Sequence, residues 1–313
     1  MGKVIAGAAT SHAFALEEPK TWDAARERVR SFYERRYGSV PSEHPRATAE
    51  TDAEIDARYA NITGGLGRIR QRVKELAPDA IVIVADDQDE IFTEDTYPQI
   101  AVYTGKDFVC RGRHQHHEVH GTGHPELAHA VLTEAVENDI DMSVVGTLRD
   151  NVLGAHAFGP VLYQLDPDGK IPVVAVFVNA VHIPAPSPKR CYELGRVIAQ
   201  AVERSAAAAK VLVVGSGGLS HYPGSYPGYP KGDFPFGSID EEFDRNALDK
   251  MRAGRGSELA KLTSAELLKS GDIEMRAWIS VLGAVGDRKP ELLVYEPLYR
   301  GLMGMAVGFW SAA

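Results

Sequence analysis

A histidine that follows a glycine-rich turn is the first candidate for chemistry in this sequence. His221 comes shortly after the apolar run Val211–Val214 and the Gly-Ser-Gly-Gly turn at 215–218. Glycine lets the backbone approach a ligand closely, and a histidine placed there can transfer protons near neutral pH. The alternative is a tight strand-to-helix turn whose histidine caps or packs. On the first interpretation, three residues of the turn contact substrate: Ser216, Gly217 and Gly218.

Polar side chains follow two other apolar runs that are typical of buried strands. His12 comes after Val4–Ala8, and Asn179 comes directly after Ile171–Val178. A buried, hydrogen-bonded core histidine is the alternative for His12. We expect Asn179 to contact a substrate.

Acidic residues gather after a further apolar run, Ala80–Ala85, where the chain reads Asp-Asp-Gln-Asp-Glu at 86–90. Open α/β sheets bind ligands at the carboxyl ends of their strands. The run therefore indicates a metal or substrate site at that edge, and a solvated turn with an aspartate helix cap is the alternative.

A glutamate shares a helix face with large apolar side chains. Glu274 lies four residues before Trp278 and eight before Leu282, which is helical spacing. The alternative is a first-turn glutamate that the helix dipole stabilises.

The segment Arg111–His129 holds six of the 11 histidines of the chain. Histidine-rich tracts suggest metal binding. However, Arg111 and Arg113 flank the tract, and no strand end supports a site. We interpret it as a polar loop that leads into a helix at Pro125.

Alternating strands and helices must position these residues. We expect strands at Val4–Ala8, Ala80–Ala85, Ile100–Tyr103, Ser143–Leu148, Ile171–Val178, Val211–Val214 and Leu292–Tyr295. We expect helices at Trp22–Tyr37, Thr51–Leu76, Leu127–Glu137, Arg190–Ala207, Asp240–Arg252 and Ser257–Lys269, with one more that carries Glu274, and a long loop at Tyr222–Gly237. No repeat or composition break divides the chain. The pattern predicts a single α/β domain over residues 1–313, with a central mixed sheet covered by helices on both faces. The helices between the first two strands would form a lid or an added wall beside the site.

The composition is that of a globular protein: 313 residues, 44% hydrophobic and 25% charged. A formal charge of -9 argues against a nucleic-acid surface. Cys110 and Cys191 form no paired motif, which argues against a disulfide scaffold or a structural zinc site. We see no signal peptide and no apolar run of membrane-spanning length, so we expect a cytoplasmic protein without membrane contacts.

Six segments, in this order along the chain, resemble the catalytic β-type chains of the class III extradiol dioxygenases, the protocatechuate 4,5-dioxygenase superfamily. They are TSH near the N-terminus, DDQ after the second strand, VNAVHIPAPSPKRCYELG, GSGGLSH, EEFDRNALDKM and GDIEMRAWISVLGA. The DQ pair and the tail YEPLYRGLMGMAVGFW are most similar to the 3-O-methylgallate dioxygenase branch. The resemblance runs over nearly the whole chain.

This resemblance implies a mononuclear non-haem Fe(II) held by two histidines and one carboxylate, with open positions for a catecholate and O2. His12 matches the first histidine ligand, and Glu274 matches the carboxylate. His221 matches an acid/base histidine outside the ligand set, and His156 matches a further active-site histidine near the substrate.

The chain departs from the best-known members at the second ligand. Their motif ends in Asn-Asp-His, and its histidine binds the metal, whereas this sequence reads Asp86-Asp87-Gln88. Gln88 could coordinate through its amide oxygen, or a nearby carboxylate such as Glu90 could substitute. A different metal, or none, is also open, because an amide is a poorer ligand than imidazole for Fe(II).

The leading hypothesis is therefore an extradiol dioxygenase that opens the ring of a catechol- or gallate-type aromatic substrate with O2 at Fe(II), and that forms a homo-oligomer. A metal-dependent hydrolase or hydratase on the same fold is the second hypothesis. A non-enzymatic binding protein is the third, since fold does not fix function.

Overall fold

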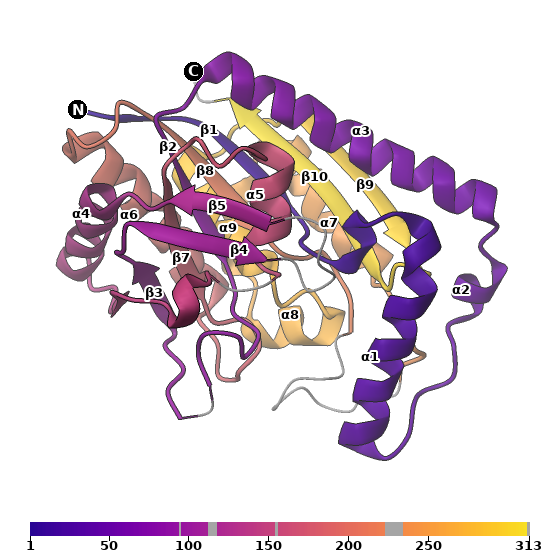
Figure 1. Ribbon diagram of the computed structural model, residues 1–313. Coiled ribbons are helices and arrows are strands. Elements are labelled where there is room, and N and C mark those ends of the chain that lie inside the picture. Colours follow the sequence, from indigo (N-terminus) through magenta and orange to yellow (C-terminus); the bar gives the residue numbers. More distant parts are fainter. Residues whose placement is uncertain (94, 112–117, 154–155, 223–233, 312–313) are drawn as a thin grey trace.

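An eight-stranded mixed sheet with the strand order β6-β3-β7-β2-β8-β1-β10-β9 runs through the protein (Figure 1). The structure is a computed structural model, and it describes residues 1–93, 95–111, 118–153, 156–222 and 234–311. The strands of this sheet are β1 (Lys3–Thr10), β2 (Ala80–Ala85), β3 (Ile100–Tyr103), β6 (Ser143–Val145), β7 (Val173–Val178), β8 (Lys210–Ser216), β9 (Leu292–Leu298) and β10 (Met303–Ser311).

The four central strands β7, β2, β8 and β1 are parallel, which brings their carboxyl ends to one edge of the sheet. The register pairs Thr10 of β1 with Ser216 of β8, and Val84 of β2 with Gly215 of β8. The residues that follow these strands therefore emerge side by side, as sites in open α/β sheets do. β10 pairs antiparallel with β1, and β3 pairs antiparallel with β7.

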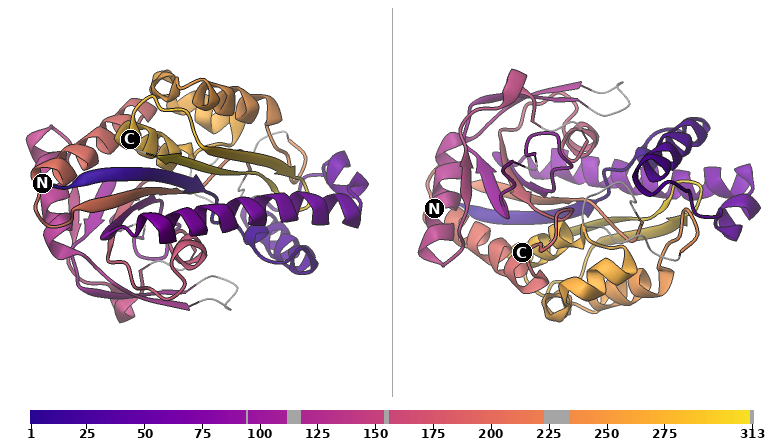
Figure 2. Two further views of the ribbon diagram at one scale, coloured as in Figure 1. Left: turned by 90° about the horizontal axis from the view of Figure 1, so that it is seen from above. Right: turned by 90° about the horizontal axis from the view of Figure 1, so that it is seen from below.

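Helices cover both faces of the sheet, as predicted (Figure 2). The α-helices are α1 (Trp22–Tyr37), α2 (Pro45–Ala49), α3 (Asp52–Leu76), α4 (Pro125–Glu137), α5 (Gly159–Leu165), α6 (Pro188–Arg204), α7 (Glu241–Arg252), α8 (Ser264–Ser270) and α9 (Met275–Val285). Short 3-10 turns lie at Phe14–Leu16, Pro19–Thr21, Arg149–Asn151 and Gly256–Lys261. Along β2, Val82 and Val84 join the core beneath α4, α6, α7 and α9, whereas Ile81 and Ile83 join the core beneath α3 and α5. This alternation confirms a single α/β arrangement with two buried sheet faces.

The predicted capping box opens α3. The Thr51 hydroxyl accepts from the backbone N–H of Glu54, whose carboxylate accepts in return from the Thr51 backbone. The helix runs for 25 residues through its three glycines. One of them has a packing reason, because a Cβ on Gly65 would lie 3.4 Å from Val307 of β10.

The histidine-rich tract differs from the expected loop. Asp107–Arg111 (β4) and Glu118–Thr122 (β5) form a separate antiparallel pair. Alternate residues of this pair are buried, including Phe108 and Val119, but charged and histidine neighbours hide that alternation in the sequence. His114, His116 and His117 lie outside the described residues, and α4 begins at Pro125 as predicted.

The single helix expected at Ser257–Lys269 is wrong. The chain makes a 3-10 turn at Gly256–Lys261 and starts again as α8, because Thr263 and Glu266 form a second capping box. Most of the loop expected at Tyr222–Gly237 lies outside the described residues. Among the helices that the structure describes, none has the length and apolar character to cross a membrane.

Candidate functional site

Three potential metal ligands converge at the carboxyl edge of the central strands. His12 follows β1, Asp86 follows β2, and Glu274 is the N-cap residue of α9. Each side chain offers one ligand atom, and these atoms lie within 4.8 Å of one another. The Nε2 atom of His12 lies 3.7 Å from Oδ1 of Asp86 and 3.7 Å from Oε2 of Glu274. All three side chains are buried.

The charges of this cluster favour a cation. Burial, with the nearby Glu274 carboxylate, raises the pKa of Asp86 well above its usual range. Oδ1 of Asp86 is buried and has no hydrogen-bond partner among the described residues. Burial lowers the pKa of His12 to about 4, so its ring is neutral at pH 7. A neutral imidazole and two close carboxylates fit a divalent cation.

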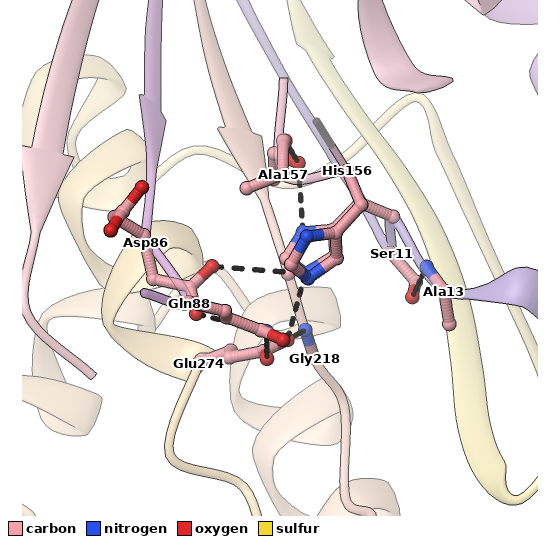
Figure 3. Close-up of polar contacts among 12 residues, drawn as sticks. Ser11, Ala13, Asp86, Gln88, His156, Ala157, Gly218 and Glu274 are labelled. Atoms are coloured by element: carbon pink, nitrogen blue, oxygen red, sulfur yellow. Dashed lines mark hydrogen bonds and ion pairs between the residues drawn. The ribbon is translucent and has the colours of Figure 1, made fainter. Parts of the chain in front are cut away.

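Glu274 is held in its ionised form. Burial alone would raise the pKa of its carboxyl, but attraction to the protonated forms of His12 and His221 and the hydrogen bonds that it accepts lower the pKa overall. At pH 7, where His12 is neutral, the contributions of His221 and of the hydrogen bonds remain. Oε2 accepts from the backbone N–H of Gly218 at 2.7 Å, and Oε1 accepts from the side-chain amide of Gln88 at 3.0 Å (Figure 3). The start of α9 adds the favourable end of a helix dipole.

Gln88 donates to both carboxylates. Its Nε2 atom lies 3.1 Å from Oδ2 of Asp86, in addition to its bond with Glu274. This hydrogen-bond network directs the amide nitrogen, rather than the oxygen, toward the cluster. Gln88 as a ligand stays a prediction, and Asp86 completes the cluster of three potential ligands.

The other acids of the 86–90 run have separate structural partners. Asp87 accepts from the backbone N–H groups of residues 90–92 and so closes a turn, but it is buried and the turn opens no helix in the part of the chain that the structure describes, unlike the solvated helix cap that was the alternative. Asp89 pairs with His182 at 2.7 Å. Glu90 bonds Nδ1 of His156 at 2.8 Å, so it lies outside the metal cluster.

Two further histidines border the cluster. His221 follows the Gly-rich turn, and its Nδ1 lies 2.8 Å from the carbonyl oxygen of Leu219, an acceptor, so Nδ1 donates. Its Nε2 therefore faces Oε1 of Glu274, 3.6 Å away. Burial would lower the pKa of His221, but the Glu274 carboxylate raises it overall. The ring of His156 meets that of His12 edge-on, with 4.9 Å between their centroids.

A cavity of about 500 Å³ opens onto this cluster. His12, Gln88, His156, His221 and Glu274 line its polar end. Its other walls are mostly apolar and aromatic: Ala13, Phe14, Ala25, Val29, Phe32, Pro160, Tyr222, Phe236, Gly237, Gly301, Leu302 and Met303, with the charged Glu17 and Arg28. Such a volume suits a single-ring aromatic molecule.

Substrate contact by Ser216, Gly217, Gly218 and Asn179 stays a prediction, because these residues do not border the cavity. A Cβ on Gly217 would lie 2.8 Å from Cβ of Glu274, so this glycine makes room for the ligand. The Asn179 side chain instead bonds the backbone of His182, closing a turn. We therefore carry none of the four into the substrate contacts proposed below.

The sequence predicted that helices between the first two strands would lie beside the site, but not which residues line the cavity. Ala25, Arg28, Val29 and Phe32 of α1 line it, and their spacing marks a single helix face. This spacing is visible in the sequence, but nothing local shows that the face meets a cavity rather than a core. The expected wall beside the site is α1, whereas α3 covers the sheet.

Comparison with known proteins agrees with this geometry. A family model described as "Catalytic LigB subunit of aromatic ring-opening dioxygenase" matches residues 42–310. The 2,3-dihydroxyphenylpropionate/2,3-dihydroxicinnamic acid 1,2-dioxygenases of Escherichia coli K12 and of Escherichia coli O157:H7 are each 29% identical over 167 residues. The match covers 52% of this chain and 49% of each relative, so it spans about half the length of these relatives.

A solved structure shares the fold. An uncharacterized protein of Escherichia coli K12 superposes with a TM-score of 0.52 at 18% sequence identity, over 78% of this chain and 92% of that one. At this identity, the likeness concerns the fold alone.

Proposed function

The chain belongs to the LigB family of aromatic ring-opening dioxygenases, and from this premise we propose that it is an extradiol dioxygenase that uses Fe(II). One observation carries the proposal: His12, Asp86 and Glu274 bring ligand atoms within 4.8 Å of one another, and His12 and Glu274 line the polar end of an aromatic-lined cavity. We propose these three side chains as the metal ligands, with Gln88 holding the two carboxylates.

Bound Fe(II) would supply the electron path between an aromatic diol and O2. The protein supplies the rest. His12 offers Nε2, and Asp86 and Glu274 offer one oxygen each. His221 has its Nδ1 proton committed to Leu219, so its Nε2 is the atom that takes a proton from a substrate hydroxyl and returns it as the ring opens. The apolar walls exclude water from the reacting groups.

His156 lies on another side of the same space. Glu90 holds its Nδ1, and its ring packs against His12. We propose that His156 contacts a substrate hydroxyl and orients the ring, while His221 carries the proton.

The substrate is proposed to carry an acidic group. The names of the relatives specify dihydroxylated phenylpropionic and cinnamic acids, and Arg28 lies among apolar residues on the α1 wall. The resemblance to the 3-O-methylgallate branch adds methoxylated gallates. We expect the enzyme to act as a homo-oligomer, which sedimentation equilibrium measures.

The decisive experiment combines metal content with oxygen uptake. Protein purified without oxygen is analysed for bound metal, loaded with Fe(II), and screened over catechols, dihydroxyphenylpropionate, gallate and 3-O-methylgallate. We expect O2 consumption matched by a ring-opened product with strong near-ultraviolet absorption. Substrate turnover without O2 consumption would refute the oxygenase.

That outcome would favour the second candidate, a metal-dependent hydrolase or hydratase. A specific observation supports it, because two carboxylates and one imidazole also suit Mn²⁺ and Mg²⁺.

A further inference from the structure

The buried side chain of Ser216 connects His12, a proposed metal ligand, to the backbone next to His156. Ser216 ends β8, is 0% exposed and lies outside the cavity lining. Its Oγ lies 3.1 Å from Nδ1 of His12. The same oxygen donates to the carbonyl of Ala157, the residue after His156.

The number of available hydrogens determines which atom donates in each of these two hydrogen bonds. A hydroxyl has one hydrogen, and the carbonyl of Ala157 can only accept it. The lone pairs of the Ser216 oxygen therefore face His12, so Nδ1 of His12 must be the donor. A neutral imidazole carries one N–H, which leaves Nε2 of His12 with a free lone pair.

The lone pair on Nε2 of His12 faces the two carboxylates of the cluster. Nε2 is the His12 atom that lies 3.7 Å from a carboxylate oxygen of Asp86 and 3.7 Å from one of Glu274. If the ring carried its proton on Nε2 instead, it would present N–H to the two carboxylates and could not bind a cation there.

We propose that Ser216 is a positioning residue that fixes the His12 tautomer, with the proton on Nδ1, and so presents Nε2 to a divalent cation. The inference rests on the proposed function for the identity of that cation, but the tautomer belongs to the metal-free protein. It assigns Ser216 a role behind the ligand in place of a substrate contact. Partners of this kind orient metal-bound histidines in general.

The tautomer is measurable directly in the wild-type protein. Histidine labelled with ¹⁵N distinguishes protonated from unprotonated ring nitrogens by NMR, and His12→Gln identifies the signals of His12. We expect protonated Nδ1 and unprotonated Nε2 in metal-free protein. Protonated Nε2 would overturn the inference without any variant being needed.

Three variants test the cause. Ser216→Ala removes the acceptor, so we expect a mixture of His12 tautomers and an affinity for Co(II) alone that is about 10- to 100-fold weaker. Ser216→Thr keeps the hydroxyl and should restore both. The matched control is Ser280→Ala, which removes an equally buried hydroxyl that donates to the carbonyl of Arg276 on α9.

The outcomes separate the two proposals. If Ser216→Ala leaves the tautomer and the Co(II) affinity as Ser280→Ala does, Ser216 has no positioning role. If the wild-type protein binds no divalent cation, the proposed function fails, while the wild-type tautomer still decides this inference. If Ser216→Ala does not fold, the wild-type spectrum and Ser216→Thr decide it.

Discussion

The side-chain amide of Gln88 donates to Oε1 of Glu274 across 3.0 Å, and this bond joins the end of β2 to the start of α9. The resemblance described above matches Gln88 to the position of a histidine ligand in the best-known members of the superfamily. We propose a different role for this position, because the amide holds the carboxylate of Glu274, a proposed ligand, from the neighbouring element.

Gln88→His should keep or raise the affinity for Fe(II), since it adds an imidazole beside two carboxylates. Anaerobic titration of metal-free protein measures this affinity. Gln71→His on the exposed side of α3 is the control and should change nothing. A sharp fall would mean that the amide bonds to Asp86 and Glu274 matter more than an added ligand.

Asp86 and Asp87 are adjacent but should respond oppositely to amide substitution. Asp86→Asn should weaken divalent-cation binding by at least tenfold and leave metal-free stability equal or higher, because it removes a carboxyl whose charged form burial disfavours and whose Oδ1 lacks a partner among the described residues. Asp87→Asn should lower stability by about 1–3 kcal/mol, because Asp87 accepts three backbone N–H groups. Chemical unfolding and metal titration of both variants provide the test. Equal metal affinity in Asp86→Asn and wild type would remove Asp86 from the ligand set.

The sequence predicted the strand-end placement of His12 and His221 because continuous apolar runs identify buried parallel strands. The sequence could not show which of the four acidic residues at 86–90 belongs to the metal cluster and which have other partners. Asp86 and Asp87 have the same side chain, and only the path of the backbone turns one toward Glu274 and the other toward residues 90–92. Local patterns carry no information on such long-range contacts.

The contacts of the Gly-rich turn at 215–218 and of α1 with distant residues could not be predicted from local patterns either. A glycine-rich turn predicts close approach of the backbone, and Gly217 does lie against another group, but that group is Glu274. The helix at Trp22–Tyr37 was predicted with the bounds that the structure has, whereas the partner of its 25–32 face depends on how a distant segment packs.

Arg28→Ala should raise KM for a carboxylated catechol by about threefold to tenfold relative to an uncharged catechol. The reason is loss of a cation at the α1 wall of the cavity. Steady-state oxygen uptake with paired substrates gives the ratio. Arg68→Ala, an exposed change on α3 that does not line the cavity, is the control. An equal effect on both substrates would place the acidic group elsewhere.

The contribution of Asp244 to stability should fall as pH rises from about 4 to 6. Burial raises the pKa of Asp244 to about 6, although Tyr295 and Ser220 donate to it. The folded protein then binds more protons than the unfolded chain in this window, so the stabilisation present at low pH is lost as pH passes 6. Urea unfolding of metal-free protein at several pH values should show a shallower decline in Asp244→Asn than in wild type or in the exposed variant Asp249→Asn. Parallel curves for all three would contradict the assignment.

His221→Phe should separate chemistry from binding. The imidazole faces the cavity through Nε2, which lies 3.6 Å from Glu274, but it is not one of the three clustered ligands. Removing it takes away the group that moves the substrate proton and leaves His12, Asp86 and Glu274 in place. We expect metal content and substrate KM within about threefold of wild type and a kcat lower by about 10²- to 10⁴-fold. Metal analysis, anaerobic substrate titration and single-turnover oxygen uptake measure the three quantities separately. A metal-free His221→Phe protein with an intact fold would make His221 itself a ligand, and the acid/base role would then pass to His156.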